Sequence, residues 1–184
     1  MRAAGCATNR TRPIDHGAAN RIAVAGDSAG GNLAAAVALM ARDRSGPSIV
    51  AQVLIYPVCD LTMAHPSIDR VGTGTDYGLT KANLVWFVQQ YAGTETDRRT
   101  PYLSPLWAAD LSGLPRAMVI TAGFDPLHDE GAAYAAALRR CGVVVEYRDY
   151  PSMVHGFAAL TRLLPHAREA IDRSAEFVRV AFAA

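Results

Sequence analysis

A pentapeptide of the pattern G-x-S-x-G, running from Gly26 to Gly30 as GDSAG, constrains this chain more than any other feature. It lies between the short strand-like run 21–26 and the Ala-rich stretch 29–44, which is hydrophobic nearly all round, as in a helix buried against a sheet. We expect glycine to be required at both ends of the pentapeptide, because a Cβ there would clash in a sharp strand-to-helix turn. Such a turn would push the Ser28 hydroxyl out above a sheet.

The rest of the chain repeats this alternation of strand and helix. The segment 49–58 is a near-continuous apolar run, which is typical of a parallel strand covered on both faces. Further strands are expected over 117–122 and 143–150, with helices after Pro126 and over 166–182. Strands that alternate with helices form a parallel sheet with right-handed crossovers. The sequence therefore predicts an α/β fold, with a mostly parallel sheet flanked by helices.

The domain organisation follows from where this pattern is interrupted. Residues 1–20 show no periodicity and read as an irregular lead, and 21–184 read as one core. Within the core, the segment 61–113 is too long for a simple connection and holds one helix candidate, 81–91. We expect it to form a cap-like insertion over the carboxyl ends of the strands, where ligands bind in open α/β sheets.

Composition excludes several classes of function. The chain has 184 residues, of which 51% are hydrophobic and 19% charged, with a formal net charge of +1. This balance favours one globular domain and does not favour a nucleic acid or an anionic membrane as partner. No apolar run approaches the ~18 residues of a membrane span, and a cytoplasmic location is expected. The three cysteines have neither disulfide nor metal-ligand spacing, so no metal is expected.

Two further residues could complete a nucleophilic site with Ser28. Asp125 follows the predicted strand 117–122, and His155 follows the predicted strand 143–150. Both should reach the sheet edge at which Ser28 lies, in the chain order nucleophile, acid, histidine. Taken singly, Ser28 or Asp125 could be a helix N-cap and His155 an ordinary loop residue. Taken together, they are better explained as a Ser-His-Asp triad.

Four segments of the sequence resemble those of a known protein family. GDSAGG at 26–31, YPV at 56–58, DPLHDEG at 125–131 and HGF at 155–157 occur in this order. In these segments the chain resembles the hormone-sensitive-lipase family of α/β-hydrolases, in the bacterial branch with Asp before the nucleophile. The resemblance is close to continuous from residue 21 to the end of the chain, which would make it the C-terminal half of such an enzyme.

The resemblance implies a role for individual residues. Ser28 would be the nucleophile, Asp125 the acid and His155 the base, and the amide N–H of Ala29 would be one oxyanion-hole donor. Candidate residues of the cap or substrate pocket are Asp27, Tyr77, Leu79, Trp86, Phe87 and Phe157. The implied substrates are small, short-chain acyl esters, and the implied chemistry needs no cofactor.

The chain departs from the family in one respect. Members carry a His-Gly-Gly motif upstream of the nucleophile, whose amides complete the oxyanion hole, and this sequence has none. The similar segment 16–19 would lie at the opposite end of a strand from Ser28, roughly 20 Å away. We therefore expect a chain truncated or misassigned at its start, with impaired activity. The strand 21–26 would then form an exposed sheet edge that allows self-association.

Other functions remain open at this point. The chain could be a catalytically impaired fragment that acts as a binding or oligomerising module. It could also be an amidase or an acyltransferase that uses the same triad, because this fold supports several acyl-transfer reactions.

Overall fold

The computed structural model describes residues 21–94 and 96–184, so the segment 16–19 lies outside the described residues. Four strands form one parallel sheet in the order β1-β2-β3-β4. They are β1 (Ile22–Asp27), β2 (Ile49–Ile55), β3 (Arg116–Phe124) and β4 (Val145–Val154). The α/β class with a parallel sheet is therefore confirmed.

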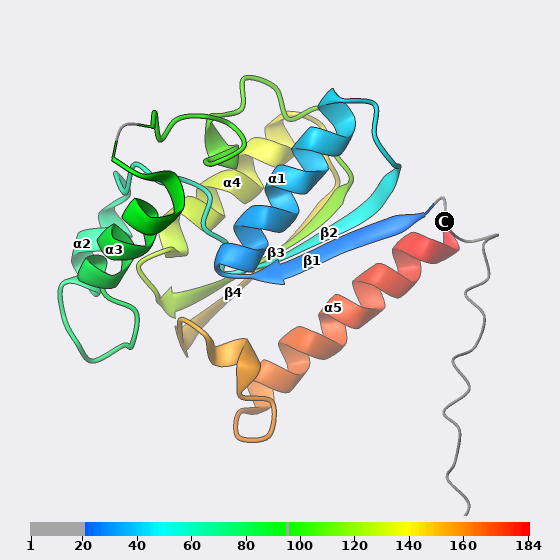
Figure 1. Cartoon of the computed structure of the whole chain (residues 1–184). Coiled ribbons are helices and arrows are strands. Elements are labelled where there is room, and N and C mark those ends of the chain that lie inside the picture. The colour runs from blue at the N-terminus through cyan, green and yellow to red at the C-terminus, as the bar shows by residue number, and fades with distance from the viewer. Residues whose placement is uncertain (1–20, 95) are drawn as a thin grey trace, which may run out of the picture.

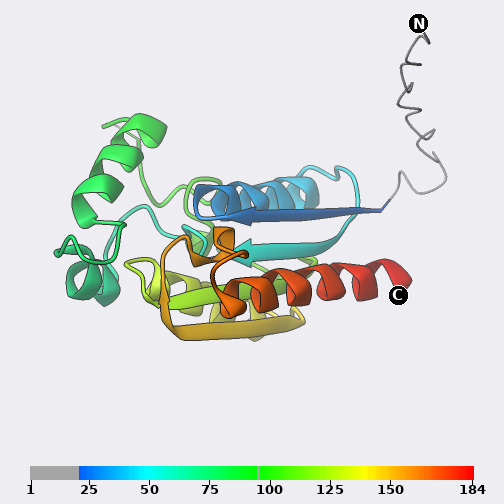
Figure 2. The ribbon, with the colours of Figure 1, turned by 90° about the horizontal axis from the view of Figure 1, so that it is seen from below.

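Helices cover both faces of this sheet (Figures 1 and 2). Helices α1 (Ala29–Asp43) and α4 (His128–Arg140) pack on one face, and α5 (Pro165–Ala183) packs on the other. Helix α4 starts two residues later than Pro126, because the chain first makes a turn in which the amide of His128 donates to the carbonyl of Asp125 at 3.1 Å.

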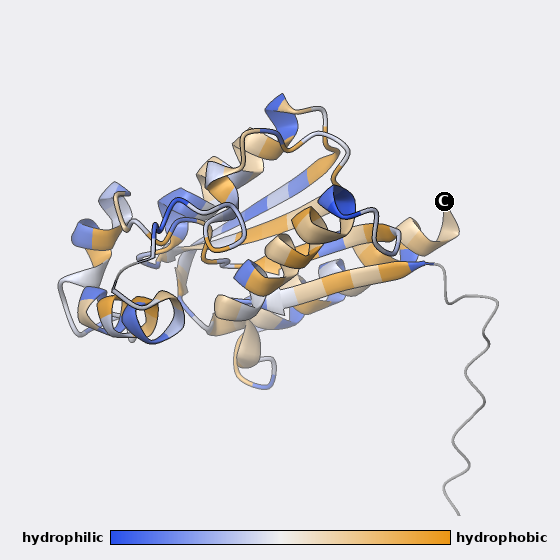
Figure 3. Cartoon of the chain, turned by 45° about the horizontal axis from the view of Figure 1, so that its top comes forward, coloured by the Kyte–Doolittle hydropathy of each residue, from blue (hydrophilic) through white to orange (hydrophobic). Residues whose placement is uncertain are grey.

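The core has two layers because successive side chains of a strand point to opposite faces. Leu54 of β2 and Val119 of β3 pack with α1 and α4, whereas Val53 and Met118 pack with α5. All four side chains are at most 1% exposed. The middle strands are mainly hydrophobic in Figure 3, in agreement with the continuous apolar runs that predicted them.

In the segment 61–113, α2 (Pro66–Gly72) and α3 (Lys81–Ala92) lie beyond the carboxyl ends of the strands (Figures 1 and 2). The end of the segment returns along α1, where Arg42 donates to the carbonyls of Asp110 and Ser112. The segment also holds the 3₁₀ turn η2 (Pro105–Trp107). A second 3₁₀ turn, η3 (Phe157–Ala159), follows β4. The prediction found α3 but missed α2, whose seven residues are too few for a hydrophobic period to be recognised.

Strand β1 lies at one edge of the sheet, where β2 is its only partner among the described strands. Ile22 is 39% exposed, and the side chain of Ala25 is also exposed. None of the helices in the described part of the chain is both long enough and apolar enough to cross a bilayer.

Candidate active site

The strand-to-helix turn forms as the pentapeptide predicts. Ser28 stands between the last residue of β1 and the first residue of α1, with φ 53° and ψ −119°. A non-glycine residue at positive φ is strained, and such strain is concentrated at functional sites. Ser28 occupies the N-cap position of α1, where its carbonyl accepts the amide of Asn32 at 3.1 Å, but its side chain makes no capping bond to the helix.

The two glycines of the turn differ in what they allow. A Cβ on Gly26 would lie 2.2 Å from the carbonyl carbon and oxygen of Gly30, which no relaxation of a side chain can relieve. A Cβ on Gly30 would meet only Asp27 Oδ1, at 3.9 Å. The expectation that both positions exclude a Cβ is therefore correct for Gly26 and wrong for Gly30. Gly31 is the second tight position, with Pro57 Cβ at 2.8 Å.

The three polar residues singled out from the sequence lie together at the carboxyl ends of the strands. His155 Nε2 lies 2.9 Å from Ser28 Oγ, and His155 Nδ1 lies 2.7 Å from Asp125 Oδ2. Asp125 is fully buried, and its other oxygen accepts the amide of Leu127 at 2.8 Å. Asp125 thus accepts a capping-type bond and also contacts the imidazole.

The ring of Tyr56 packs against the imidazole of His155, and the sequence did not indicate Tyr56 as a site residue. Its ring centroid lies 4.7 Å from that of His155, and its backbone has φ 34°, a second strained position. Burial, followed by the negative charge of Asp27, raises the pKa of the Tyr56 hydroxyl above its usual range. The YPV segment was noted only as part of a motif, and nothing in it indicated contact with His155.

A cavity of about 590 Å³ opens beside Ser28 and His155. Its walls come from α1, from the loop after β2 and from α3, and they are almost entirely apolar. The lining residues that the sequence did not indicate include Asn32, Leu33, Val58, Leu61, Leu84 and Tyr91. Asn32 also holds two loops, because its Nδ2 donates to the carbonyls of Val58 at 2.9 Å and Leu103 at 2.8 Å.

The aromatic and aliphatic pocket candidates of the 61–113 segment divide into two groups. Leu79 and Phe87 line the cavity. Trp86 is 57% exposed and is not among the lining residues, because adjacent positions of a helix point about 100° apart. Tyr77 stacks instead on Phe124, with 4.9 Å between the ring centroids.

The other two pocket candidates also lie outside the cavity. Phe157 is fully buried between Tyr56 and Tyr150, at centroid distances of 5.8 and 5.1 Å, so it belongs to the core. Asp27 Oδ2 lies 3.4 Å from the hydroxyl of Tyr56. Ala29 does line the cavity, directly after Ser28. Within residues 21–94 and 96–184, no group of three or more His, Cys, Asp or Glu side chains could hold a metal ion.

Comparison with known proteins gives closely similar sequences. The family model described as alpha/beta hydrolase fold matches residues 3–159. The carboxylic ester hydrolase LipN of Mycobacterium tuberculosis is 47% identical over 148 residues, which cover 78% of this chain and 39% of LipN. The ethyl acetate hydrolase of Pseudomonas putida is 40% identical over 154 residues, covering 83% of this chain and 48% of that enzyme.

The chain is also similar to solved structures of esterases. The hyperthermophilic esterase of the archaeon Pyrobaculum calidifontis matches with a TM-score of 0.83 and 44% identity, over 89% of this chain and 53% of that one. EstE1, a thermostable carboxylesterase from a metagenomic library, matches with a TM-score of 0.83 and 40% identity, over 88% of this chain and 55% of that one. The chain thus spans about half the length of the relatives that it matches. By its sequence and its fold, the chain belongs to the alpha/beta hydrolase fold family.

Proposed function

We propose that this chain carries the catalytic triad of a serine carboxylesterase, with Ser28 as nucleophile, His155 as general base and Asp125 as the orienting acid. The observation that carries the proposal is the position of His155, 2.9 Å from Ser28 Oγ and 2.7 Å from Asp125 Oδ2. A nucleophile within hydrogen-bond reach of a base, itself oriented by a third group, is the arrangement that acyl transfer requires.

In the first half of the reaction, Ser28 Oγ attacks the carbonyl carbon of an ester while its proton moves to His155 Nε2. Asp125 accepts the Nδ1–H of the imidazole, which keeps Nε2 as the basic nitrogen and stabilises the imidazolium. The negative charge that develops on the carbonyl oxygen would be stabilised by the amide of Ala29, near the N-terminus of α1. His155 then donates its proton to the leaving alcohol, and an acyl-serine remains.

In the second half, water attacks the acyl carbon and transfers a proton to His155. Collapse of the intermediate returns that proton to Ser28 and releases the carboxylic acid. No group other than those of the chain and water is needed for this cycle. Because one family motif that donates to the oxyanion is absent from the sequence, we expect a slow reaction: loss of one donor typically lowers kcat by about 10²–10³.

The chemistry of the cavity supports a class of substrate. Leu33, Leu61, Phe87 and Val88 contribute apolar surface, and none of the lining side chains is an acid, a lysine or an arginine. An apolar cavity favours the burial of uncharged groups and disfavours charged ones. We therefore propose neutral esters with a short, apolar acyl or alcohol group as substrates.

Hydrolysis of p-nitrophenyl butyrate, measured with the chain and with Ser28→Ala at equal purity, tests this function. The proposal predicts slow release of p-nitrophenolate that disappears in the variant. Equal rates from two proteins that both fold would contradict it. Amide cleavage faster than ester cleavage, or preferential acyl transfer to an added alcohol, would favour the amidase or acyltransferase reading of the same triad.

A further inference from the structure

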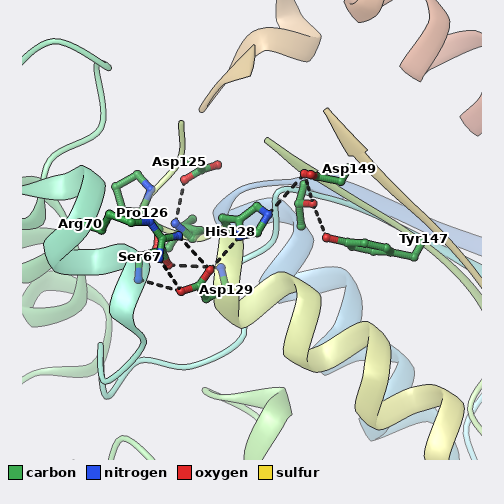
Figure 4. Close-up of polar contacts among 10 residues, drawn as sticks. Ser67, Arg70, Asp125, Pro126, His128, Asp129, Tyr147 and Asp149 are labelled. Atoms are coloured by element: carbon green, nitrogen blue, oxygen red, sulfur yellow. Dashed lines mark hydrogen bonds and ion pairs between the residues drawn. The ribbon is translucent and has the colours of Figure 1, made fainter. Parts of the chain in front are cut away.

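A group of polar residues outside the cavity joins the 61–113 segment to the turn that carries Asp125. Helix α2 contributes Ser67 and Arg70, the turn contributes Pro126, and α4 contributes Asp129. Figure 4 shows these side chains gathered around the start of α4, directly beside Asp125. The proposed mechanism uses none of them.

Ser67 makes three hydrogen bonds to this region. Its hydroxyl donates to the carbonyl of Pro126 at 2.6 Å and accepts the amide of Asp129 at 3.2 Å. Its own amide donates to Asp129 Oδ2 at 2.9 Å. The two bonds with Asp129 are partly buried, whereas the Ser67 side chain and its bond to Pro126 are completely buried. An unmade hydrogen bond costs most in such a place.

Asp129 makes the remaining polar contacts of this group. The guanidinium of Arg70 lies 3.1 Å from its Oδ1, and His128 Nδ1 lies 2.8 Å from the same oxygen. Burial opposes ionisation of Asp129, but the hydrogen bonds from His128 and Arg70 outweigh it and hold the pKa of this carboxyl below its usual range. The bonds to Ser67 and Arg70 are therefore made to a charged acceptor, which strengthens them.

The same helix also packs against the wall of the cavity. Ile68 of α2, Leu84 of α3 and Leu127 of the turn that carries Asp125 form one buried apolar cluster. Leu84 lines the cavity, and the amide of Leu127 donates to Asp125 Oδ1. Helix α2 thus contacts the turn that carries Asp125 through Ser67, and it contacts the cavity wall through Ile68.

On the other side, His128 extends the group toward the strand that precedes His155. Its Nε2 lies 3.4 Å from Asp149 Oδ1 on β4. Asp149 in turn accepts the hydroxyl of Thr121 on β3 at 2.9 Å. The turn after β3 is therefore held both by α2 and by the strand that leads to the imidazole.

We infer that Ser67 and Asp129 form a clamp that fixes the Asp125 turn, so that Ser67 is a positioning residue for Asp125 and helix α2 couples the cavity wall to the triad. Neither Ser67 nor Asp129 is among the residues that line the cavity. The expected effect of the clamp on kcat rests on the proposed function, whereas its expected effect on amide exchange in the Asp125 turn does not.

Amide hydrogen exchange, followed by mass spectrometry on the full chain, tests the mechanical part. Ser67→Ala should raise exchange by at least tenfold in two segments far apart in sequence, 66–72 and 125–131. A matched control is Ser104→Ala, because Ser104 is equally buried and accepts the amide of Leu61 at 2.8 Å in the same insertion. That variant should leave exchange in 125–131 unchanged. Unchanged exchange in 125–131 with Ser67→Ala would overturn the clamp.

The exposed partner supplies a variant that will not unfold the chain. The Arg70 side chain is 55% exposed, and Arg70→Gln should raise exchange in 125–131 by a smaller factor than Ser67→Ala. If Ser67→Ala does not fold, this variant decides the question: no change in 125–131 would contradict the clamp, and an increase would support it.

Kinetics on p-nitrophenyl butyrate tests the positioning role. Ser67→Ala should lower kcat about tenfold with little change in KM, because the clamp acts on Asp125. Ser104→Ala should change KM more than kcat, because Leu61 lines the cavity. An unchanged kcat in Ser67→Ala would overturn the positioning role. If the unmodified chain shows no hydrolysis, the proposed function fails. The clamp is then tested by amide hydrogen exchange in 125–131 alone.

Discussion

His155 and Asp125 meet at 2.7 Å although they come from the ends of two different strands, β4 and β3. The geometry leaves Asp125 little freedom, because its second oxygen accepts the amide of Leu127 at 2.8 Å. The carboxylate therefore presents one defined oxygen to the Nδ1 of the imidazole.

Asp125→Asn should keep the fold and remove most of the activity. The amide oxygen of the variant can still accept from Leu127, which turns the amide N–H₂ toward His155 Nδ1. That donor favours the tautomer with hydrogen on Nε2, which cannot take the proton of Ser28. We expect kcat for p-nitrophenyl butyrate to fall by about 10⁴. Asp110→Asn, at an exposed carboxylate away from the cavity, should have no such effect, and equal losses in both variants would contradict the assignment.

The two glycines of the strand-to-helix turn should respond differently to alanine. Gly26→Ala places a Cβ 2.2 Å from the backbone of Gly30, so we expect this variant to misfold or to lose most of its stability. Gly30→Ala meets only Asp27 Oδ1 at 3.9 Å and should stabilise α1 by about 0.5–1 kcal/mol. Urea unfolding followed by circular dichroism measures both. A Gly26→Ala variant as stable as the unmodified chain would refute the close approach.

Glu130 should make the stability of the chain depend on pH. This carboxyl is fully buried, its Oε1 accepts the amides of Cys59 and Asp60, and burial raises its pKa from 4.5 to about 8. Between these two pH values the unfolded chain loses the proton while the folded chain keeps it, so this contribution to the free energy of unfolding falls as pH rises.

Glu130→Gln removes this titration while an amide oxygen can still accept both backbone amides. We expect the urea midpoint of the unmodified chain to fall between pH 5 and pH 8, and that of the variant to fall less. Glu169→Gln, on the exposed side of α5, should retain the full fall. Parallel pH profiles for Glu130→Gln and the unmodified chain would show that Glu130 is ionised in the folded state throughout.

The edge of the sheet should cause self-association. Strand β1 has no lysine, arginine or proline, and such residues commonly protect an edge from pairing with another chain. Ala25→Lys, at an exposed position of this strand, should reduce the mass observed by sedimentation at high protein concentration. Val144→Lys serves as control, because Val144 is 66% exposed and precedes β4 at the other edge. A monomeric unmodified chain would contradict this expectation.

The sequence was sufficient where local pattern and chain order decide the outcome. The apolar run 49–58 predicted β2. The places of Ser28, Asp125 and His155 at the ends of three parallel strands, β1, β3 and β4, predicted that these side chains would meet. Parallel strands bring their carboxyl ends to one edge, so placement after a strand already specifies a location in space.

The sequence was insufficient where tertiary contacts decide. Phe157 lies two positions after His155, yet it is fully buried, and no local pattern distinguishes a core aromatic residue from one that lines a pocket. The bonds of Ser67 to Pro126 and Asp129 join residues about sixty positions apart. Helix α2 has only seven residues, and it is held by these bonds and by the packing of Ile68 rather than by helical periodicity.

Covalent labelling of Ser28 tests the central claim most directly, because it does not require complete turnover. An activated phosphate triester such as diethyl p-nitrophenyl phosphate reacts with an activated serine, which displaces p-nitrophenolate and keeps the diethylphosphoryl group. Intact mass and peptide mapping should show one such group on Ser28 of the unmodified chain, none on Ser28→Ala and much slower labelling of Asp125→Asn. A folded chain that gains no group, or a Ser28→Ala variant that is still labelled, would contradict the assignment of Ser28 as an activated nucleophile.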